Sequence, residues 1–311
     1  RLKKALWNLY WRGSAPMRER IESELDPEQK KRAARQAELV DPDWVAYEVA
    51  EFVTLARSGA YFAGDRRVSR QERTKWRSTF SRHAKDAQAA LRVDVDTAAP
   101  AVEAMIDLAC EMSAVYLFRS EDPVAAARFV VSEHAHLLWS RVREERGFEV
   151  FTASAAPQLV RWERSYGWTR FGSGVIAEKE TSLAAVLAQM LQVPDAWLGF
   201  ADGYLDALDS RAPVKHGSGR DLASDLAEWH ELLLDRLATY DAWDRLERLA
   251  GHQRLTGPEA VFFQARCAHR RGDLDQARRL VGESLERLPG HPQMLAFATE
   301  IGAPLPAHAA R

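Results

Sequence analysis

The chain has 311 residues, of which 46% are hydrophobic and 28% are charged, a composition typical of a globular protein with a sizeable core. Its 43 lysines and arginines nearly balance its 45 aspartates and glutamates, so the net charge of −2 excludes a strong overall attraction to nucleic acid or to an anionic membrane. The charge is uneven, because residues 1–100 carry 20 basic against 15 acidic side chains. A polyanionic partner would therefore meet the N-terminal third of the chain.

The two cysteines, Cys110 and Cys267, lie far apart and lack the close spacing of a disulfide framework or a zinc site. We therefore expect a reducing, cytoplasmic setting. No run of about 18 apolar residues occurs, and the N-terminal segment lacks the layout of a signal peptide, so the sequence predicts no membrane partner. Because the chain begins at Arg1 rather than at methionine, we expect it to be a piece of a longer protein.

Almost every segment has the composition of a helix, and alternation of apolar and polar residues with a period of two is hard to find. Start signals recur at Asp26-Pro27, Asp41-Pro42 and Asp122-Pro123, where an N-cap acceptor precedes a proline in the first turn. Short connections predict antiparallel helical hairpins. The expected fold class is all-α, with helices over residues 2–11, 15–24, 27–39, 42–58, 70–92, 98–118, 123–146, 149–166, 182–192, 194–209, 221–238, 241–250, 258–271, 273–288 and 291–301.

A basic segment at residues 64–85 raises the question of nucleic-acid binding. A helix over 70–92 places Trp76 and Phe80 on one apolar stripe, so both are expected to face the core. Most basic side chains are spread round the polar side, which favours an ordinary solvated face. A tighter group lies at the start of the helix, where the dipole and the free N–H groups favour phosphate. This group is the candidate nucleic-acid site: Arg66, Arg67, Arg70, Arg73 and Arg77.

Two further patterns contain groups that carry chemistry in other proteins. Glu103, Asp107 and Glu111 form an acidic row opposite the apolar side of their helix, and we expect them to face solvent or a partner rather than a cleft. Glu133 and His136 share a helix face, which is half of a carboxylate-bridged di-metal motif. Because no second copy occurs, we favour a hydrogen-bonded core histidine at His136, with a metal site as the outside alternative. The sequence predicts no cofactor and no catalytic residue.

Aromatic and arginine side chains gather just before an irregular stretch at residues 167–181. Tryptophan and arginine are enriched at protein interfaces, so this group is a candidate for partner binding. Packing of its tryptophans in the core is the favoured interpretation, because each buries a large apolar area. The members of the group are Arg161, Trp162, Arg164, Tyr166, Trp168 and Arg170.

A second irregular stretch, rich in proline, glycine and charge, occupies residues 210–220 and is predicted to be a linker. It divides the chain into an all-helical N-terminal domain at 1–209 and a smaller helical-repeat domain at 221–311. We therefore expect about two domains for a chain of this length.

The second domain contains a segment of 34 residues, 258–291, in which small residues and a proline recur at spacings of 7, 5 and 12. Ala265, Gly272, Ala277 and Pro289 occupy these positions. In this pattern the segment resembles one tetratricopeptide repeat, a unit of two helices. The resemblance implies close contact of the helices at the alanines, a turn opened by the glycine and a second helix ended by the proline. It also implies a helical-repeat C-terminus, which is commonly a partner-binding architecture.

Four positions depart from the repeat pattern, since its usual aromatic and alanine side chains are replaced by Val261, Ala268, Val281 and Ser284. A lone hairpin cannot bury its apolar face, so it has to stack on the helices before it. From the helical composition and this resemblance we predict a non-catalytic helical-repeat scaffold that binds a protein or peptide. The alternatives are a nucleic-acid-binding helical protein that uses the arginines at 66–77 and a metal-dependent helical-bundle enzyme.

Overall fold

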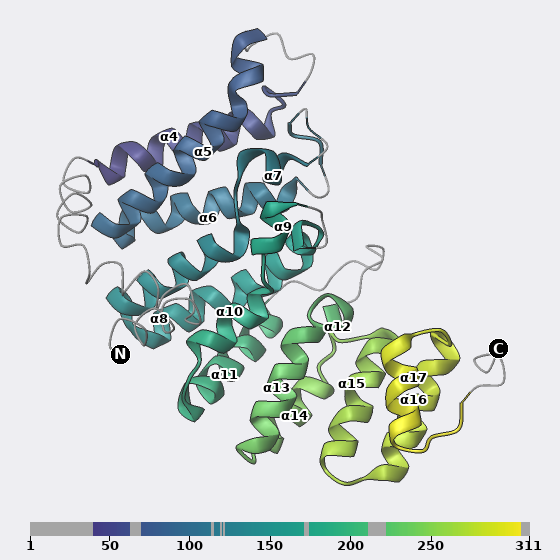
Figure 1. The fold of residues 1–311 in the computed structure, drawn as a ribbon. Coiled ribbons are helices and arrows are strands. Elements are labelled where there is room, and N and C mark those ends of the chain that lie inside the picture. The colour runs from purple at the N-terminus through teal and green to yellow at the C-terminus, as the bar shows by residue number, and fades with distance from the viewer. Residues whose placement is uncertain are drawn as a thin grey trace, which may run out of the picture.

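The computed structural model describes residues 40–62, 70–112, 115–118, 120, 122–170, 174–210 and 222–305. The side chains of residues 70–74 and 164–170 fall outside this description. Within it every regular element is an α-helix, so the predicted all-α class is confirmed. The helices predicted at 2–11, 15–24 and 27–39 lie outside the described residues. Figure 1 shows the described helices arranged side by side in a stack that runs from α4 to α17.

Three long helices form the first layer of the stack: α4 (Pro42–Arg57), α5 (Arg70–Val93) and α6 (Val95–Glu111). Asp41 and Asp94 cap α4 and α6, because their side chains accept backbone N–H groups of the first turn. Trp76 and Phe80 of α5 are only 2% and 0% exposed, which confirms the predicted inward stripe. The cap at Asp94 starts α6 three residues before the predicted 98–118, and the helix also ends earlier.

The helix predicted at 123–146 consists of two elements, α7 (Pro123–Ala127) and the start of α8 (Val131–Arg170). Arg128 separates them because its backbone lies in the left-handed region, with φ of 56°, and ends α7. The helix predicted at 149–166 is the second half of α8. The two halves meet at a kink at Gly147, whose φ of 83° is readily adopted only by glycine.

A buried carboxylate from later in the chain fixes the start of α8. Glu180 lies between α9 (Val175–Lys179) and α10 (Leu183–Met190), and it accepts the backbone N–H groups of the first two residues of α8 at 2.7 and 3.0 Å. Glu163 of α8 in turn accepts the N–H of Leu183 at 2.9 Å. The stretch predicted to be irregular at 167–181 therefore contains the short helix α9, and the segment that follows it is held on both halves of α8.

The next helix, α11 (Pro194–Ser210), packs against the second half of α8 at two glycines. A Cβ atom on Gly199 would lie 2.9 Å from Phe148 Cε1, and one on Gly203 would overlap Thr152 Cγ2. The absence of side chains at these two positions therefore sets how closely the two helices approach.

The Gly203→Ala substitution is expected to lower the free energy of unfolding by about 1–3 kcal/mol, because the added methyl group meets a buried, β-branched side chain with little rotational freedom. Gly282→Ala in α16 (Leu274–Arg287) is the control, since nothing lies within 4 Å of a Cβ atom there. This change is expected to raise stability by about 0.5–1 kcal/mol. Urea denaturation measures both values, and equal stability of the two variants would contradict the close approach of α8 and α11.

The stack continues through α12 (Leu222–Asp225), α13 (Ala227–Thr239), α14 (Trp243–Ala250), α15 (Gly257–Arg270), α16 and α17 (Pro292–Glu300). The single helix predicted at 221–238 is broken at Leu226, which has φ of −112° and ψ of 18°. Between α15 and α16 the turn contains Gly272 with φ of 88°, and Ala265 and Ala277 of these helices are fully buried. These positions are the ones on which the resemblance to a tetratricopeptide repeat rests, and that resemblance stays a prediction.

One apolar core runs through most of the stack, from Val45 of α4 to Phe263 of α15. A second, smaller cluster lies among α15, α16 and α17. The predicted linker at 210–220 lies, apart from its first residue, outside the described residues, so a domain division at that point stays a prediction. The core continues from α11 to α13 on either side of it, with the Trp197 and Trp229 rings stacked at 5.8 Å between centroids.

Candidate functional site

Of the five arginines predicted to bind nucleic acid, the structure describes the side chain of one. Arg77 is exposed, and its guanidinium lies 5.8 Å from the centre of the Trp76 ring, where it covers a core side chain. Nucleic-acid binding by the group stays a prediction. The other members lie outside the described residues or have undescribed side chains: Arg66, Arg67, Arg70 and Arg73.

The predicted partner-binding group contains a core residue. Trp162 has no exposed surface: its ring stacks on Trp139 at 6.1 Å between centroids, and its indole N–H donates to Asp107 Oδ1 at 2.6 Å. This position corrects the partner-binding assignment of Trp162, because an enclosed ring offers nothing for a partner to contact. Arg161 is bound within the fold, as described next. The side chains of the remaining members are outside the description: Arg164, Tyr166, Trp168 and Arg170.

The acidic row of α6 binds cations of neighbouring helices. Arg161 of α8 pairs with Glu103 at 2.5 Å and with Asp107 at 2.9 Å, and Arg57 of α4 pairs with Glu111 at 2.5 Å. The row is thus partly exposed, in keeping with the expectation, but it also joins three helices, which the sequence did not predict. Burial is the largest influence on Asp107 and raises the pKa of its carboxyl group, against the opposing effect of its hydrogen-bond donors.

Glu133 and His136 are not part of a metal site in the described part of the chain, where no three histidine, cysteine or acidic side chains converge. Glu133 is exposed and His136 is half-buried. The core histidine of this helix is instead His134, which stacks on Phe129 at 3.8 Å and donates from Nδ1 to the Val130 carbonyl at 2.7 Å. Desolvation lowers the pKa of His134 to about 4, so the ring is neutral at pH 7.

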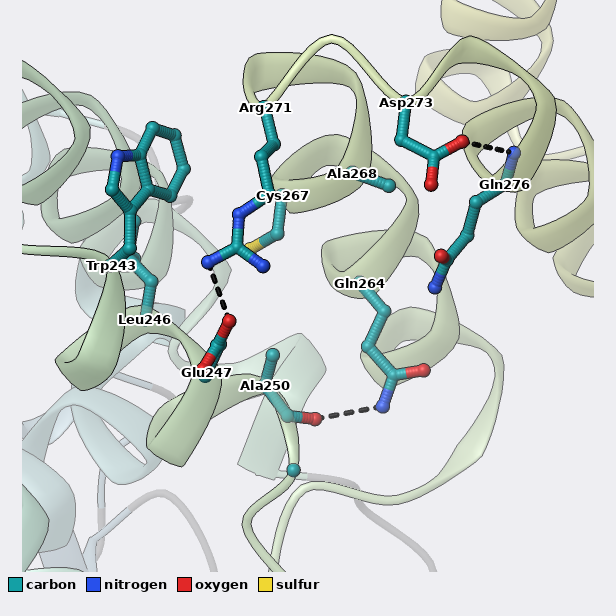
Figure 2. Close-up of a pocket in the computed structure, with 11 residues that line it drawn as sticks. Trp243, Leu246, Glu247, Ala250, Gln264, Cys267, Ala268, Arg271, Asp273 and Gln276 are labelled. Atoms are coloured by element: carbon teal, nitrogen blue, oxygen red, sulfur yellow. Dashed lines mark hydrogen bonds and ion pairs between the residues drawn. The ribbon is translucent and has the colours of Figure 1, made fainter.

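A pocket of about 270 Å³ opens between α14 and the hairpin of α15 and α16 (Figure 2). In this view Trp243 and Arg271 lie on one side of the pocket, and Gln264 and Gln276 lie on the other. The pocket thus combines a small apolar area with groups that donate and accept hydrogen bonds. The apolar part of the lining comes from Leu246, Ala250 and Ala268.

An ion pair and a ring contact hold the first side of the pocket. The Arg271 guanidinium lies 5.1 Å from the centre of the Trp243 ring and pairs with Glu247 at 2.5 Å. Contact with the ring and the carboxylate restricts the long arginine side chain, and the two opposite charges compensate each other. This side of the pocket therefore presents a fixed surface of low net charge.

Two amide side chains form the second side. Gln264 Nε2 donates to the backbone carbonyl of Ala250 at 2.7 Å, which ties α15 to the end of α14. Asp273 caps α16 by accepting the backbone N–H of Gln276 at 3.0 Å, which places the Gln276 side chain at the edge of the pocket. Each glutamine immediately precedes a buried alanine of the repeat pattern. This position in the pattern is the sequence signal that could have identified both glutamines as candidate site residues.

Burial keeps three titratable side chains in or near this region in their neutral forms. Cys267 borders the pocket, and burial raises the pKa of its thiol to about 12, so the thiolate is scarce at neutral pH. Tyr204 and His230 form a buried pair with Oη and Nε2 2.8 Å apart. Desolvation lowers the pKa of His230 to about 3 and raises that of Tyr204 far above its ordinary range. Both side chains of this pair are therefore neutral at pH 7.

Comparison with known proteins finds no relative: no family model, curated protein or solved structure matches the chain. Across the helices that the structure describes, none combines the length and the apolar character that crossing a membrane requires.

Proposed function

We propose that the chain is a non-catalytic helical scaffold, in a reducing, cytoplasmic setting, that binds a peptide segment of another protein in the pocket between α14 and the α15–α16 hairpin. The observation that carries this proposal is the combination of a small apolar area with two amide side chains at its edge (Figure 2). The all-helical fold supports it, because successive helical pairs create extended binding surfaces between them. Both cysteines are free thiols, which supports the setting.

The chemistry of the pocket favours an extended peptide over a strongly charged small molecule. Gln276 presents an amide that both donates and accepts hydrogen bonds, as a peptide backbone requires of its partner. The volume beside Leu246 suits one apolar side chain of the peptide. Because Arg271 and Glu247 compensate each other, and the remaining carboxylate of the lining, Asp273, caps a helix, the pocket has little net charge with which to select an acidic or a basic group.

The same polar groups support binding rather than reaction. A nucleophile or general base needs a group whose pKa lies near the working pH and which is not committed elsewhere. Glu247 is paired with an arginine, Asp273 caps a helix, and burial raises the pKa of the Cys267 thiol to about 12.

The resemblance of residues 258–291 to a tetratricopeptide repeat supports a partner-binding function as well. The turn glycine has φ of 88° and the two alanines are buried, in keeping with what the resemblance implies. The hairpin also packs on α13 and α14, which supply the neighbouring apolar surface that a single repeat needs.

Selection of a random peptide library against the full chain tests the proposal. We expect selected peptides to bind the Gln276→Ala variant about fivefold more weakly, because a hydrogen bond of about 1 kcal/mol is lost. Gln293→Ala, which changes an exposed glutamine of α17 outside the pocket, is the control and is expected to bind like the unchanged chain. The pocket is refuted as a binding site if no peptide is selected, or if every selected peptide binds all three proteins equally.

A further inference from the structure

A second and larger hollow lies between the second half of α8 and α11. It encloses about 720 Å³, which is within the range of ligand and peptide sites. Its lining extends along α11 from Asp195 to Ser210, about 22 Å at a rise of 1.5 Å per residue. We call this hollow the trough. Its small apolar lining residues are Ala153 and Pro157 of α8 and Gly199, Gly203 and Ala207 of α11.

Small residues give the trough its shape. Gly199 and Gly203 allow α11 to lie against Phe148 and Thr152 of α8, so no side chain rises from α11 along the line of contact. The small residues keep this part of the lining low, and the polar part of the lining comes from carboxylate and hydroxyl side chains.

An unpaired hydroxyl group borders the same trough. Thr152 is 6% exposed, and its Oγ1 has no hydrogen-bond partner in the described part of the protein. Buried polar atoms in folded proteins are nearly always paired, and because this oxygen is itself enclosed, a molecule bound in the trough would become its partner only if the Thr152 side chain turned towards it. This observation is independent of the charge of the trough.

The charge of the trough is acidic. Within the described residues its lining contains carboxylates but no lysine or arginine. Asp202 is bonded to Arg245 of α14 at 2.8 Å, and Asp206 lies 3.4 Å from an arginine of the same helix. Glu149 and Asp195 have no ion pair with any residue that the structure describes. Carboxylates that line one hollow attract cations and repel anions.

We propose that the trough binds a short basic segment of a partner protein, with lysine or arginine side chains beside Glu149 and Asp195 and an apolar side chain against the small residues Ala153, Pro157 and Ala207. The acidic lining excludes nucleic acid and anionic lipid. A metal ion fits less well, because no three metal-ligating side chains converge in the described part of the chain. From Asp195 to Asp206 the trough spans about 16 Å, which about five residues of extended peptide cover. This binding goes beyond the function proposed above, since it uses another surface and selects charge.

The test selects a displayed library of random heptapeptides against the full chain. We expect one class of selected peptides to combine lysine or arginine residues with an apolar residue and to bind more weakly as the salt concentration rises. The double variant Glu149→Gln with Asp195→Asn removes two charges that support no ion pair of the described fold. It is expected to weaken the binding of these basic peptides about tenfold.

A matched double variant separates local charge from overall charge. Glu286→Gln with Glu300→Gln removes the same number of charges from exposed positions on α16 and α17, and is expected to leave the affinity unchanged. Gln276→Ala is also expected to leave it unchanged, which separates the trough from the pocket of Figure 2. Equal weakening by both double variants would overturn the proposal. So would selection without any basic class, or binding of spermidine as tight as that of the basic peptide, which would assign the trough to a free polyamine.

Discussion

Replacing Trp162 with alanine is expected to lower the free energy of unfolding by about 3–5 kcal/mol, the usual range for removing a large buried aromatic side chain. The ring is stacked on Trp139 and has no exposed surface, so the substitution leaves a cavity between the halves of α8 and α6. It also removes the indole N–H that donates to Asp107 at 2.6 Å. Asp107 then keeps its ion pair with Arg161 but loses a hydrogen-bond donor, and this lowers the free energy of unfolding further.

Urea denaturation followed by circular dichroism measures this loss. Trp44→Ala is the matched control, because Trp44 is 59% exposed on α4 and its removal is expected to change stability by less than about 0.5 kcal/mol. Trp162→Phe keeps most of the packing without the hydrogen bond and is expected to fall between the two. If Trp162→Ala proved as mild as Trp44→Ala, the ring would have to lie on the surface, and its assignment to a partner-binding group would stand again.

Acidification from pH 6.5 to pH 4.5 is expected to destabilise the fold through two buried histidines. Desolvation lowers the pKa of His134 to about 4 and that of His230 to about 3, from an ordinary value of 6.5. In this window the unfolded chain binds protons that the folded chain does not. The stability that the fold gains from keeping each histidine neutral is therefore fully present above pH 6.5. It is lost as the pH falls towards the folded pKa, by on the order of 2–3 kcal/mol per histidine over the window.

Three buried or half-buried carboxyl groups oppose this trend. Burial raises the pKa of Asp107, Glu180 and Glu231 above their ordinary values. Their contribution to stability is present at low pH and is lost as the pH rises through the raised pKa, so acidification strengthens it. The pH dependence of the unchanged protein is the sum of both effects, and a variant is needed to separate them.

The His134→Gln variant isolates one histidine. At pH 7 it is expected to be about 1–2 kcal/mol less stable than the unchanged chain, because the stacking on Phe129 and the bond to the Val130 carbonyl are lost. Below pH 6.5 this deficit is expected to shrink by roughly 1 kcal/mol per pH unit, since glutamine does not titrate. Urea denaturation at several pH values provides the comparison. A deficit that stayed constant with pH would contradict the neutral, buried state of His134.

Features that depend on neighbouring residues were predictable from the sequence. The starts of α4 and α7 follow from an aspartate before a proline, and the inward face of α5 follows from the spacing of Trp76 and Phe80. In each case the determining residues lie within one or two turns of each other. The break at Arg128 was missed, because a left-handed arginine has no signature in composition and is maintained by the packing around it.

Features that depend on which helices meet were not predictable in this way. Glu103 and Arg161 are 58 residues apart in the sequence, and composition does not encode their contact. Without that contact, an acidic row and an arginine beside a tryptophan both resemble surface features. The two sides of the candidate pocket are likewise brought together by the packing of α14 against the next hairpin. Helix identity is thus a local property of this chain, whereas its candidate binding surfaces come from packing.

The cap that Glu180 places on α8 has a consequence for the order in which the protein is made. The carboxylate follows the first residue of α8 by 49 positions, so at translation rates of about 5–20 residues per second it leaves the ribosome about 2–10 s later. During that interval the first turn of α8 exists without the acceptor for its N–H groups. The cap on this helix is therefore supplied only after the segment that follows α9 has been synthesised and packs against α8.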